Sequence, residues 1–392
     1  MDHATATETA TRKEKEEDKM DTLNTLIIFY NRDKVAESDD PDQDTRTFGA
    51  RCHCGNVEFN VTFPTSYLPL SAYICSCTLC RYSHGTFGSY HVSLPQGIAP
   101  EWTSSNFNMQ VYKTPGSGAG GHGQRMFCPK CGAHNGHYEA WAGQWVVDIS
   151  LFDAPVFWCL KGFGFPKSSG DGGLLSWLPV VGGRRLTQVS LDHDFPPAYE
   201  LEVGANGEER LRAECLCGGV RFTIPRPSDA VNEDDFMSEY VSPHDPFKWK
   251  AFLDFSRDSR LVSSAHGVPW ILVPRAVLEP EVPPDLKIGT IKTYESSDND
   301  TRGFCGTCGA TIFLKCKNRS PSESTEVLNI SMGILRAPEG AKAEDWVTWR
   351  AGKPYCAKEG IEYDPEFVGA IVEGQRSWSI EEYGEAPDFD IV

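Results

Sequence analysis

Residues 50–64 read ARCHCGNVEFNVTFP, and residues 213–225 read AECLCGGVRFTIP. Each stretch opens with Cys-x-Cys-Gly and continues as alternating apolar and polar residues up to a proline. Such alternation is typical of a strand that buries one face. Because the pattern occurs twice, the sequence predicts a duplicated domain built mainly from short strands.

A second shared motif lies downstream of each stretch. Residues 127–133 read FCPKCGA, and residues 304–310 read FCGTCGA. Each is followed by an alternating segment, VDIS at 147–150 and LNIS at 328–331. The order of motifs is therefore the same in both halves of the chain, which supports the duplication.

The motif order divides the 392 residues into three regions. We expect a polar, disordered tail at residues 1–45, a first domain at 46–205 and a second at 206–392. The join is expected near the polar, glycine-containing stretch 203–209. The apolar residues 26–30, LIIFY, are interpreted as a packing strand rather than an added edge strand.

Composition narrows the class of protein. The formal net charge of −18 argues against nucleic acid as the main partner, since an acidic surface repels phosphate backbones. We find neither an apolar run long enough to span a membrane nor an N-terminal signal core, so we expect a cytoplasmic protein with no membrane partner. In that reducing compartment the fourteen cysteines indicate metal binding rather than disulfides.

Eight of these cysteines fall into two sets of the same pattern. The first set is Cys52, Cys54, Cys128 and Cys131, and the second is Cys215, Cys217, Cys305 and Cys308. Four thiolates are the usual ligands of a closed, structural zinc site. The sequence therefore predicts one structural zinc in each domain.

The first half contains a further cluster in residues 75–81, CSCTLCR. Cys75, Cys77 and Cys80 can share one zinc, and three protein ligands with an open position are typical of a catalytic site. Two alternatives remain open: the three thiols join the first set in a shared cluster, or His84 closes the site as a fourth ligand.

The second half has different residues at the matching positions. Aligning Arg260 with Arg81 places Asp254, Ser256 and Ser259 where the first half has Cys75, Cys77 and Cys80. One carboxylate and two hydroxyls hold zinc poorly compared with three thiolates. We therefore expect a degenerate second domain with structural zinc only, and three zinc ions per chain.

Together these motifs resemble the glutathione-dependent formaldehyde-activating enzyme family, which includes centromere-protein-V-like proteins. The resemblance rests on Cys-x-Cys-Gly, on Cys-x-Cys-x-x-Cys-Arg with Gly85 four residues beyond Arg81, and on Phe-Cys-x-x-Cys-Gly. It covers residues 48–195 and, in degenerate form, 210–350. It implies two tandem β-tent domains of twisted antiparallel sheets, with the zinc ligands assigned above. The namesake reaction joins formaldehyde to glutathione as S-hydroxymethylglutathione, formally a carbon–sulfur lyase reaction.

Candidate catalytic groups surround the three-cysteine cluster. His84 is our candidate proton carrier, and Arg81 is a candidate partner for a substrate carboxylate or for an acidic neighbour. Tyr90 and His91 lie on the next expected strand, where only one of them faces the core. Seven residues surround the second cysteine pair and are explained mainly by strand packing: Arg125, His134, His137, Tyr138, Glu139, Trp141 and Asp148.

Extra loops make the namesake substrate less suited to this chain. A glycine-rich insert at 115–124, interpreted as a flexible loop or lid, and bulky loops at 157–185 make a larger carbonyl or thioether at least as good a candidate substrate as formaldehyde. Our first hypothesis is a zinc-dependent lyase or dehydratase, with glutathione as candidate substrate or co-substrate. The rivals are a non-catalytic zinc-binding interaction module and a thiol redox sensor. Three further cysteines are expected to be buried thiols: Cys159, Cys316 and Cys356.

Overall fold

The computed structural model describes residues 44–105, 108–114, 124–189 and 198–391. The expected tail up to residue 43, the apolar stretch 26–30 within it and nearly all of the insert at 115–124 lie outside the described residues. Among the helices described, none is long and apolar enough to cross a membrane.

The first half is built on one large mixed sheet with a smaller sheet beside it. Its strands are β1 (Thr45–Arg51), β2 (Glu58–Pro64), β3 (Leu70–Cys75), β4 (Ser89–Ser93), β5 (Glu101–Trp102), β6 (Gln110–Lys113), β7 (Gln124–Phe127), β8 (His134–Glu139), β9 (Gln144–Asp148), β10 (Trp158–Gly164), β11 (Val180–Val181), β12 (Arg184–Arg185) and β13 (Thr187–Val189). The large sheet has the order β13-β10-β3-β4-β9-β8-β7-β6, and the small one β1-β2-β5. The remaining two strands, β11 and β12, form a separate hairpin.

The second half repeats this strand order. Its strands are β14 (Glu202–Val203), β15 (Glu209–Glu214), β16 (Arg221–Pro225), β17 (Trp249–Asp254), β18 (Val268–Pro274), β19 (Ile291–Glu295), β20 (Asp300–Cys305), β21 (Thr311–Cys316), β22 (Val327–Ser331) and β23 (Val347–Trp349). From one edge the large sheet runs β23-β17-β18-β22-β21-β20-β19, which matches β10-β3-β4-β9-β8-β7-β6 position by position.

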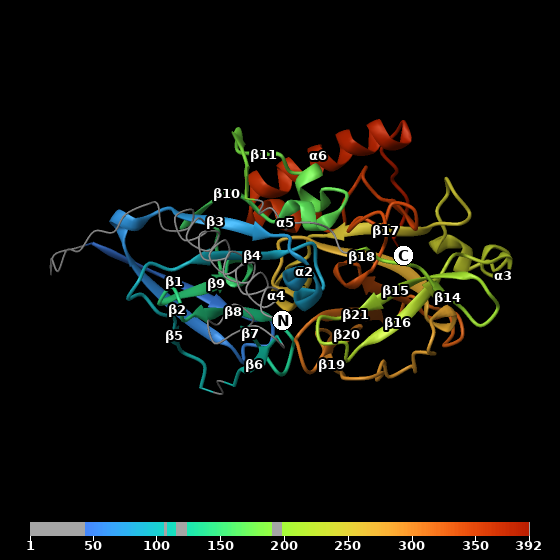
Figure 1. The fold of residues 1–392 in the computed structure, drawn as a ribbon, viewed down its shortest axis with the longest axis horizontal. Helices are drawn as coiled ribbons and strands as arrows, with labels where there is room; N and C mark the ends of the chain where they lie inside the picture. Colours follow the sequence, from blue (N-terminus) through green and yellow to red (C-terminus); the bar gives the residue numbers. More distant parts are fainter. Residues whose placement is uncertain (1–43, 106–107, 115–123, 190–197, 392) are drawn as a thin grey trace, which may run out of the picture.

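Among the residues that the structure describes, the helices are short, with one exception. They are α2 (Thr78–His84), α3 (Asp229–Asn232), α4 (Arg257–Ser263), α5 (Ala357–Tyr363) and α6 (Pro365–Tyr383), together with 3-10 turns η1 (Thr65–Tyr67), η2 (Ile149–Leu151), η3 (Pro166–Ser169), η4 (Gly173–Ser176), η5 (Met237–Tyr240), η6 (Arg275–Val277) and η7 (Met332–Ile334). In each half a short helix follows the matching strand: α2 follows β3, and α4 follows β17. Figure 1 shows the two sheet-rich halves side by side.

The predicted mainly β fold is confirmed, but its sheets are not purely antiparallel. Strand β10 runs parallel to both β3 and β13, and β23 runs parallel to β17. Parallel neighbours need long crossover connections, so their pairing cannot be inferred from local alternation of side chains. The alternation does locate the buried face of β2, where Phe59, Val61 and Phe63 are buried.

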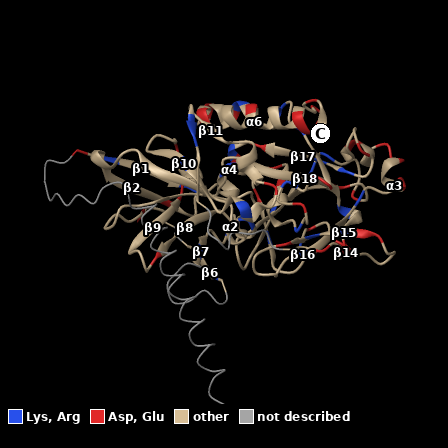
Figure 2. Ribbon diagram, turned by 45° about the horizontal axis from the view of Figure 1, so that its top comes forward, with Lys and Arg blue, Asp and Glu red and all other residues tan. Residues whose placement is uncertain are grey.

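Helix α6 is a long element that the sequence analysis did not predict. It begins at the Asp364 cap, whose side chain accepts a hydrogen bond from the amide of Phe367, and it ends at the left-handed Gly384. It lies over both halves (Figure 1) and carries acidic and basic residues along its length (Figure 2). Its Trp378 ring packs 5.2 Å from that of Trp177 in the first half.

The cysteine loops join the halves crosswise. The amide of His53, between Cys52 and Cys54, donates to the carbonyl of Leu261 in α4 at 3.3 Å. The amide of Leu216 donates to the carbonyl of Tyr82 in α2 at 3.1 Å. The stretch 203–209, expected as the join, runs from the end of β14 through a turn into the start of β15, and these two strands pair as a hairpin in the second half.

Two glycines of α6 provide a matched test of how this helix docks. A Cβ on Gly374 would clash with the carbonyl oxygen of Trp177, whereas a Cβ on Gly369 meets nothing within 4 Å. We expect Gly369→Ala to stabilise the protein by ~0.5–1 kcal/mol, because alanine favours a helix. Gly374→Ala should lower the melting temperature. Equal shifts in thermal melts of the two variants would contradict this docking.

Candidate metal centre

Each half has a small three-stranded sheet, β1-β2-β5 in the first and β14-β15-β16 in the second. In each half, four cysteine sulfurs meet where the loop between two strands of this sheet approaches a turn of the large sheet. In the first half, Cys54 Sγ lies 3.5 Å from the sulfurs of both Cys52 and Cys128, and Cys131 completes the set. In the second half, Cys217 Sγ lies 3.6 Å from Cys215 Sγ and 3.4 Å from Cys305 Sγ, with Cys308 as the fourth member. The predicted groupings are both found.

The spacing of the sulfurs fits a metal ion rather than a disulfide. All the cysteines are free thiols, and the sulfurs of each set lie within 4.8 Å of one another. A tetrahedral zinc with bonds of ~2.3 Å needs sulfurs about 3.8 Å apart. Gly132 and Gly309 follow the Cys-x-x-Cys turns with φ of +85° and +82°, a left-handed conformation that glycine adopts without strain. Each set can therefore hold a metal ion.

The third set forms where β3 runs into α2. Cys75 ends β3, and Cys77 caps the helix, where its sulfur accepts a hydrogen bond from the amide of Cys80 at 3.4 Å. The three sulfurs lie within 4.8 Å of one another, and among the described residues no fourth Cys, His, Asp or Glu donor joins them. Within the described residues the three cysteines do not merge with the first four-cysteine set, and His84 does not join them as a fourth ligand.

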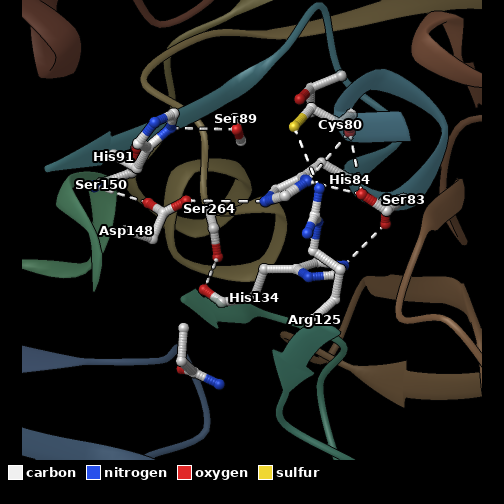
Figure 3. Close-up of polar contacts among 12 residues, drawn as sticks. Cys80, Ser83, His84, Ser89, His91, Arg125, His134, Asp148, Ser150 and Ser264 are labelled. Atoms are coloured by element: carbon white, nitrogen blue, oxygen red, sulfur yellow. Dashed lines mark hydrogen bonds and ion pairs between the residues drawn. The ribbon is translucent and has the colours of Figure 1, made fainter. Parts of the chain in front are cut away.

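A buried arginine lies against this third set. Arg125 on β7 donates to Cys80 Sγ at 3.5 Å, and its side chain is buried. Burial opposes the charged form of Arg125, but the thiolates of Cys80 and Cys77 outweigh it and raise the pKa of the guanidinium. A fixed positive charge therefore faces the sulfurs (Figure 3).

His84 lies beside the cysteines in a closed polar cluster. Its Nδ1 is 3.1 Å from the carbonyl oxygen of Cys80, and its Nε2 is 3.9 Å from Asp148 Oδ2. Its ring stacks on that of His134 at 4.1 Å. Burial lowers the pKa of His84 to about 4 and raises the pKa of the Asp148 carboxyl well above its usual range. Both shifts favour the uncharged forms.

Tyr90 and His91 point to opposite faces of β4, as successive strand residues do. Tyr90 is buried, and its ring stacks on that of His266 from the second half at 5.2 Å. His91 Nδ1 lies 3.3 Å from Ser89 Oγ, and the Cys80 thiolate is among the charges that act on its pKa, which burial lowers. The side chain of Tyr90 therefore packs in the contact between the halves, while His91 lies on the opposite face of β4.

Arg81 contacts backbone carbonyls. Its Nε donates to the carbonyl of Ser76 at 3.2 Å, and its Nη2 donates to that of Ser168 at 3.0 Å. Its side chain is buried. These bonds tie helix α2 to the turn η3, which lies within the loops at 157–185.

The residues around the second cysteine pair divide into two groups. Arg125, His134 and Asp148 come together with His84, and His134 Nε2 lies 2.7 Å from the carbonyl oxygen of Ser83. His137 lies 3.3 Å from Glu139 and pairs with it, while Tyr138 is exposed. The contact of Arg125 with Cys80 was missed because the two residues lie on different elements 45 positions apart.

The second half places other residues in the same geometry. Ser256 caps α4, and its hydroxyl accepts from the amide of Ser259 at 3.3 Å, as Cys77 does for Cys80. Arg302 on β20 donates to Ser259 Oγ at 3.1 Å, as Arg125 does to Cys80. Asp254 ends β17 just as Cys75 ends β3.

Comparison with known protein families finds a match for one segment of the chain. Residues 47–158 match the family model described as glutathione-dependent formaldehyde-activating enzyme. This confirms the resemblance for a segment that contains the first four-cysteine set and the three-cysteine set. The match does not extend into the second half. No curated protein sequence matches the chain.

A cysteine substitution tests the four-cysteine sets. Cys308→Ser should remove bound metal and lower the melting temperature sharply, because metal binding to such a set contributes directly to folding. Cys159→Ser is the matched control, since Cys159 belongs to none of the three sets. Metal analysis and thermal melts of both variants check this. An unchanged melting temperature in Cys308→Ser would show that its set holds no structural metal.

Proposed function

We propose that the first half is a zinc-dependent carbon–sulfur lyase, acting on a thiol adduct or carbonyl substrate at Cys75, Cys77 and Cys80. The convergence of three sulfurs with no fourth described donor carries this proposal. The family match over residues 47–158 supports the reaction class. Cys77 is only half-buried, whereas Cys75 and Cys80 are buried, so any substrate would approach the set from the side of Cys77. We also propose zinc in both four-cysteine sets, giving three ions per chain.

The proposed chemistry adds a thiol to a carbonyl or reverses that addition. In the addition, a carbon–sulfur bond forms, the carbonyl π bond breaks, and the thiol proton moves to the carbonyl oxygen. A zinc bound by the three cysteines would supply a Lewis-acidic position for the substrate. Arg125 stabilises the negative charge of the thiolates through its bond to Cys80.

His84 is the proposed proton carrier, and its ring is held in position at Nδ1. The Nε2 atom of His84 faces Asp148 Oδ2, while Nδ1 is fixed by the carbonyl of Cys80 and the hydroxyl of Ser83. His91 replaces Tyr90 as the second candidate near the set, since Tyr90 packs against His266. Arg81 acts as a positioning residue rather than as a substrate contact.

The loops at 157–185 set the substrate size in this proposal. Arg81 binds the carbonyl of Ser168, so this loop region is held against the helix that carries Cys77 and Cys80. Glutathione remains a candidate substrate or co-substrate, alongside larger thioethers. We further propose that the chain is a tandem duplication of domains 46–205 and 206–392, supported by the repeated strand order.

Replacing one cysteine of the third set separates catalysis from stability. Cys77→Ser should abolish turnover of glutathione with ¹³C-formaldehyde, followed by NMR as S-hydroxymethylglutathione above the uncatalysed rate. Its melting temperature should stay close to that of the wild type, unlike that of Cys54→Ser in the four-cysteine set. Full turnover in Cys77→Ser would overturn the proposed site. If the wild type is inactive on this pair, the same test applies to larger aldehydes and thiols.

Two substitutions of His84 distinguish proton transfer from positioning. His84→Ala should lower turnover by ~10²- to 10⁴-fold, the usual contribution of a general acid or base. His84→Gln keeps a hydrogen-bonding side chain but cannot carry the proton, so it should be equally slow. Metal content is measured on the same samples. Recovery of activity in His84→Gln would reduce His84 to a positioning residue, and loss of one metal ion in His84→Ala would make it a ligand.

A further inference from the structure

A cavity of about 380 Å³ opens in the second half, at the place that corresponds to the three-cysteine set of the first. Asp254 and Ser256, the counterparts of Cys75 and Cys77, line it. Helix α5 and the residues just before it form part of the wall, including Tyr355. The volume lies in the range of small-molecule sites. The second half therefore has a pocket where the first half has a candidate metal centre.

Three guanidinium groups line this pocket, and none pairs with a carboxylate side chain of the described residues. Arg302 donates to the hydroxyls of Ser296 at 2.9 Å and Ser259 at 3.1 Å. Arg319 donates through Nη1 to Asn329 Oδ1. Its Nε is buried without a hydrogen-bond partner. The third, Arg257, is exposed at the start of α4. A buried donor without a partner is costly, so the described residues leave the guanidinium of Arg319 only partly satisfied.

The acidic groups of the pocket already have partners. Asp254 accepts from the amide of Ser256 at 2.8 Å, from Ser259 Oγ, and from Trp270 Nε1 at 3.3 Å. Three others are engaged in the same way: Asp258 with His53, Asp300 with Ser297 and Glu359 with the amide of Arg257. Each carboxylate of the pocket therefore has a partner within the chain, while Arg302 and Arg319 keep N–H donors that no described residue accepts.

The remaining wall suits the apolar body of a ligand. Phe252, Leu314, Tyr355 and Ile391 line the same cavity. Such a mixture of apolar surface and a few fixed donors is typical of sites for small organic molecules. Arginine also matches the geometry of a carboxylate, which it binds with two parallel hydrogen bonds.

We propose that the second half binds a small organic acid in this pocket, with its carboxylate on Arg302 and Arg319 and its apolar body against Phe252 and Leu314. The site is separate from the lyase proposed for the first half and uses no metal. It gives the second half a binding role of its own.

Calorimetric titration of the full chain with 3-phenylpropanoate tests this proposal. We expect saturable binding, no binding of 3-phenylpropanamide, and at least about tenfold weaker binding in Arg319→Gln, since a charge-assisted hydrogen bond is lost. Arg257→Gln, at an exposed position, should weaken binding as well. Arg185→Gln in β12 removes the same charge from an exposed position outside the pocket and should bind like the wild type.

Alkylation of cysteines provides a second readout. Cys316 and Cys356 line the pocket, so 3-phenylpropanoate should slow their modification by N-ethylmaleimide, while that of Cys159 stays unchanged. Cys77→Ser should leave binding intact, which separates this site from the lyase site. The proposal is overturned if wild type binds no 3-phenylpropanoate, if the amide binds equally well, or if inorganic phosphate binds as tightly as the carboxylate.

Discussion

The structure depends on the crosswise contact between the cysteine loop of each half and the helix of the other. His53 donates to Leu261 of α4, and Leu216 donates to Tyr82 of α2. The turns after the second cysteine pairs meet in the same region, where a Cβ on Gly132 would touch Phe304 and one on Gly309 would touch Phe127. A metal ion that fixes either loop therefore also fixes a helix in the opposite half. The candidate centre on α2 is held in part by the second half of the chain.

The same backbone serves two different chemistries in the two halves. In both halves a strand ends and the side chain of Cys77 or Ser256 caps the next helix. The cap accepts a hydrogen bond from the amide of a residue in the first turn, Cys80 or Ser259. With sulfur at these positions the turn gathers three candidate metal ligands. With oxygen at these positions, Asp254 accepts a hydrogen bond from the amide of Ser256 at the start of the helix. The space beside these residues remains a cavity. The fold thus preserves the location of a site while the residue type decides what the site can bind.

Cysteine spacing and strand alternation were enough to predict the mainly β fold and the grouping of all eleven cysteines in three sets. They could not place Arg125 against Cys80, because strand pairing between distant segments brings these residues together. Nor could alternation decide between Tyr90 and His91, since contact with the second half buries the face that Tyr90 occupies. Helix α6 was missed although Asp364, Pro365 and Gly384 are helix boundary signals. Its buried positions include Gln375 and Ser379, which weaken the apolar pattern.

The paired arginines connect the two proposals electrostatically. Three thiolates around a divalent ion carry a net charge of about −1, and Arg125 supplies the compensating charge in the first half. Arg302 has the corresponding place in the second half, but a neutral hydroxyl stands where the thiolate would be. Asp254 does not replace that thiolate as a direct ion-pair partner, since its oxygens accept from the start of α4, from Trp270 and from the Ser259 hydroxyl that separates it from Arg302. Arg302 is therefore retained without a thiolate or carboxylate in direct contact, and its remaining N–H donors are the groups that the proposed ligand carboxylate would use.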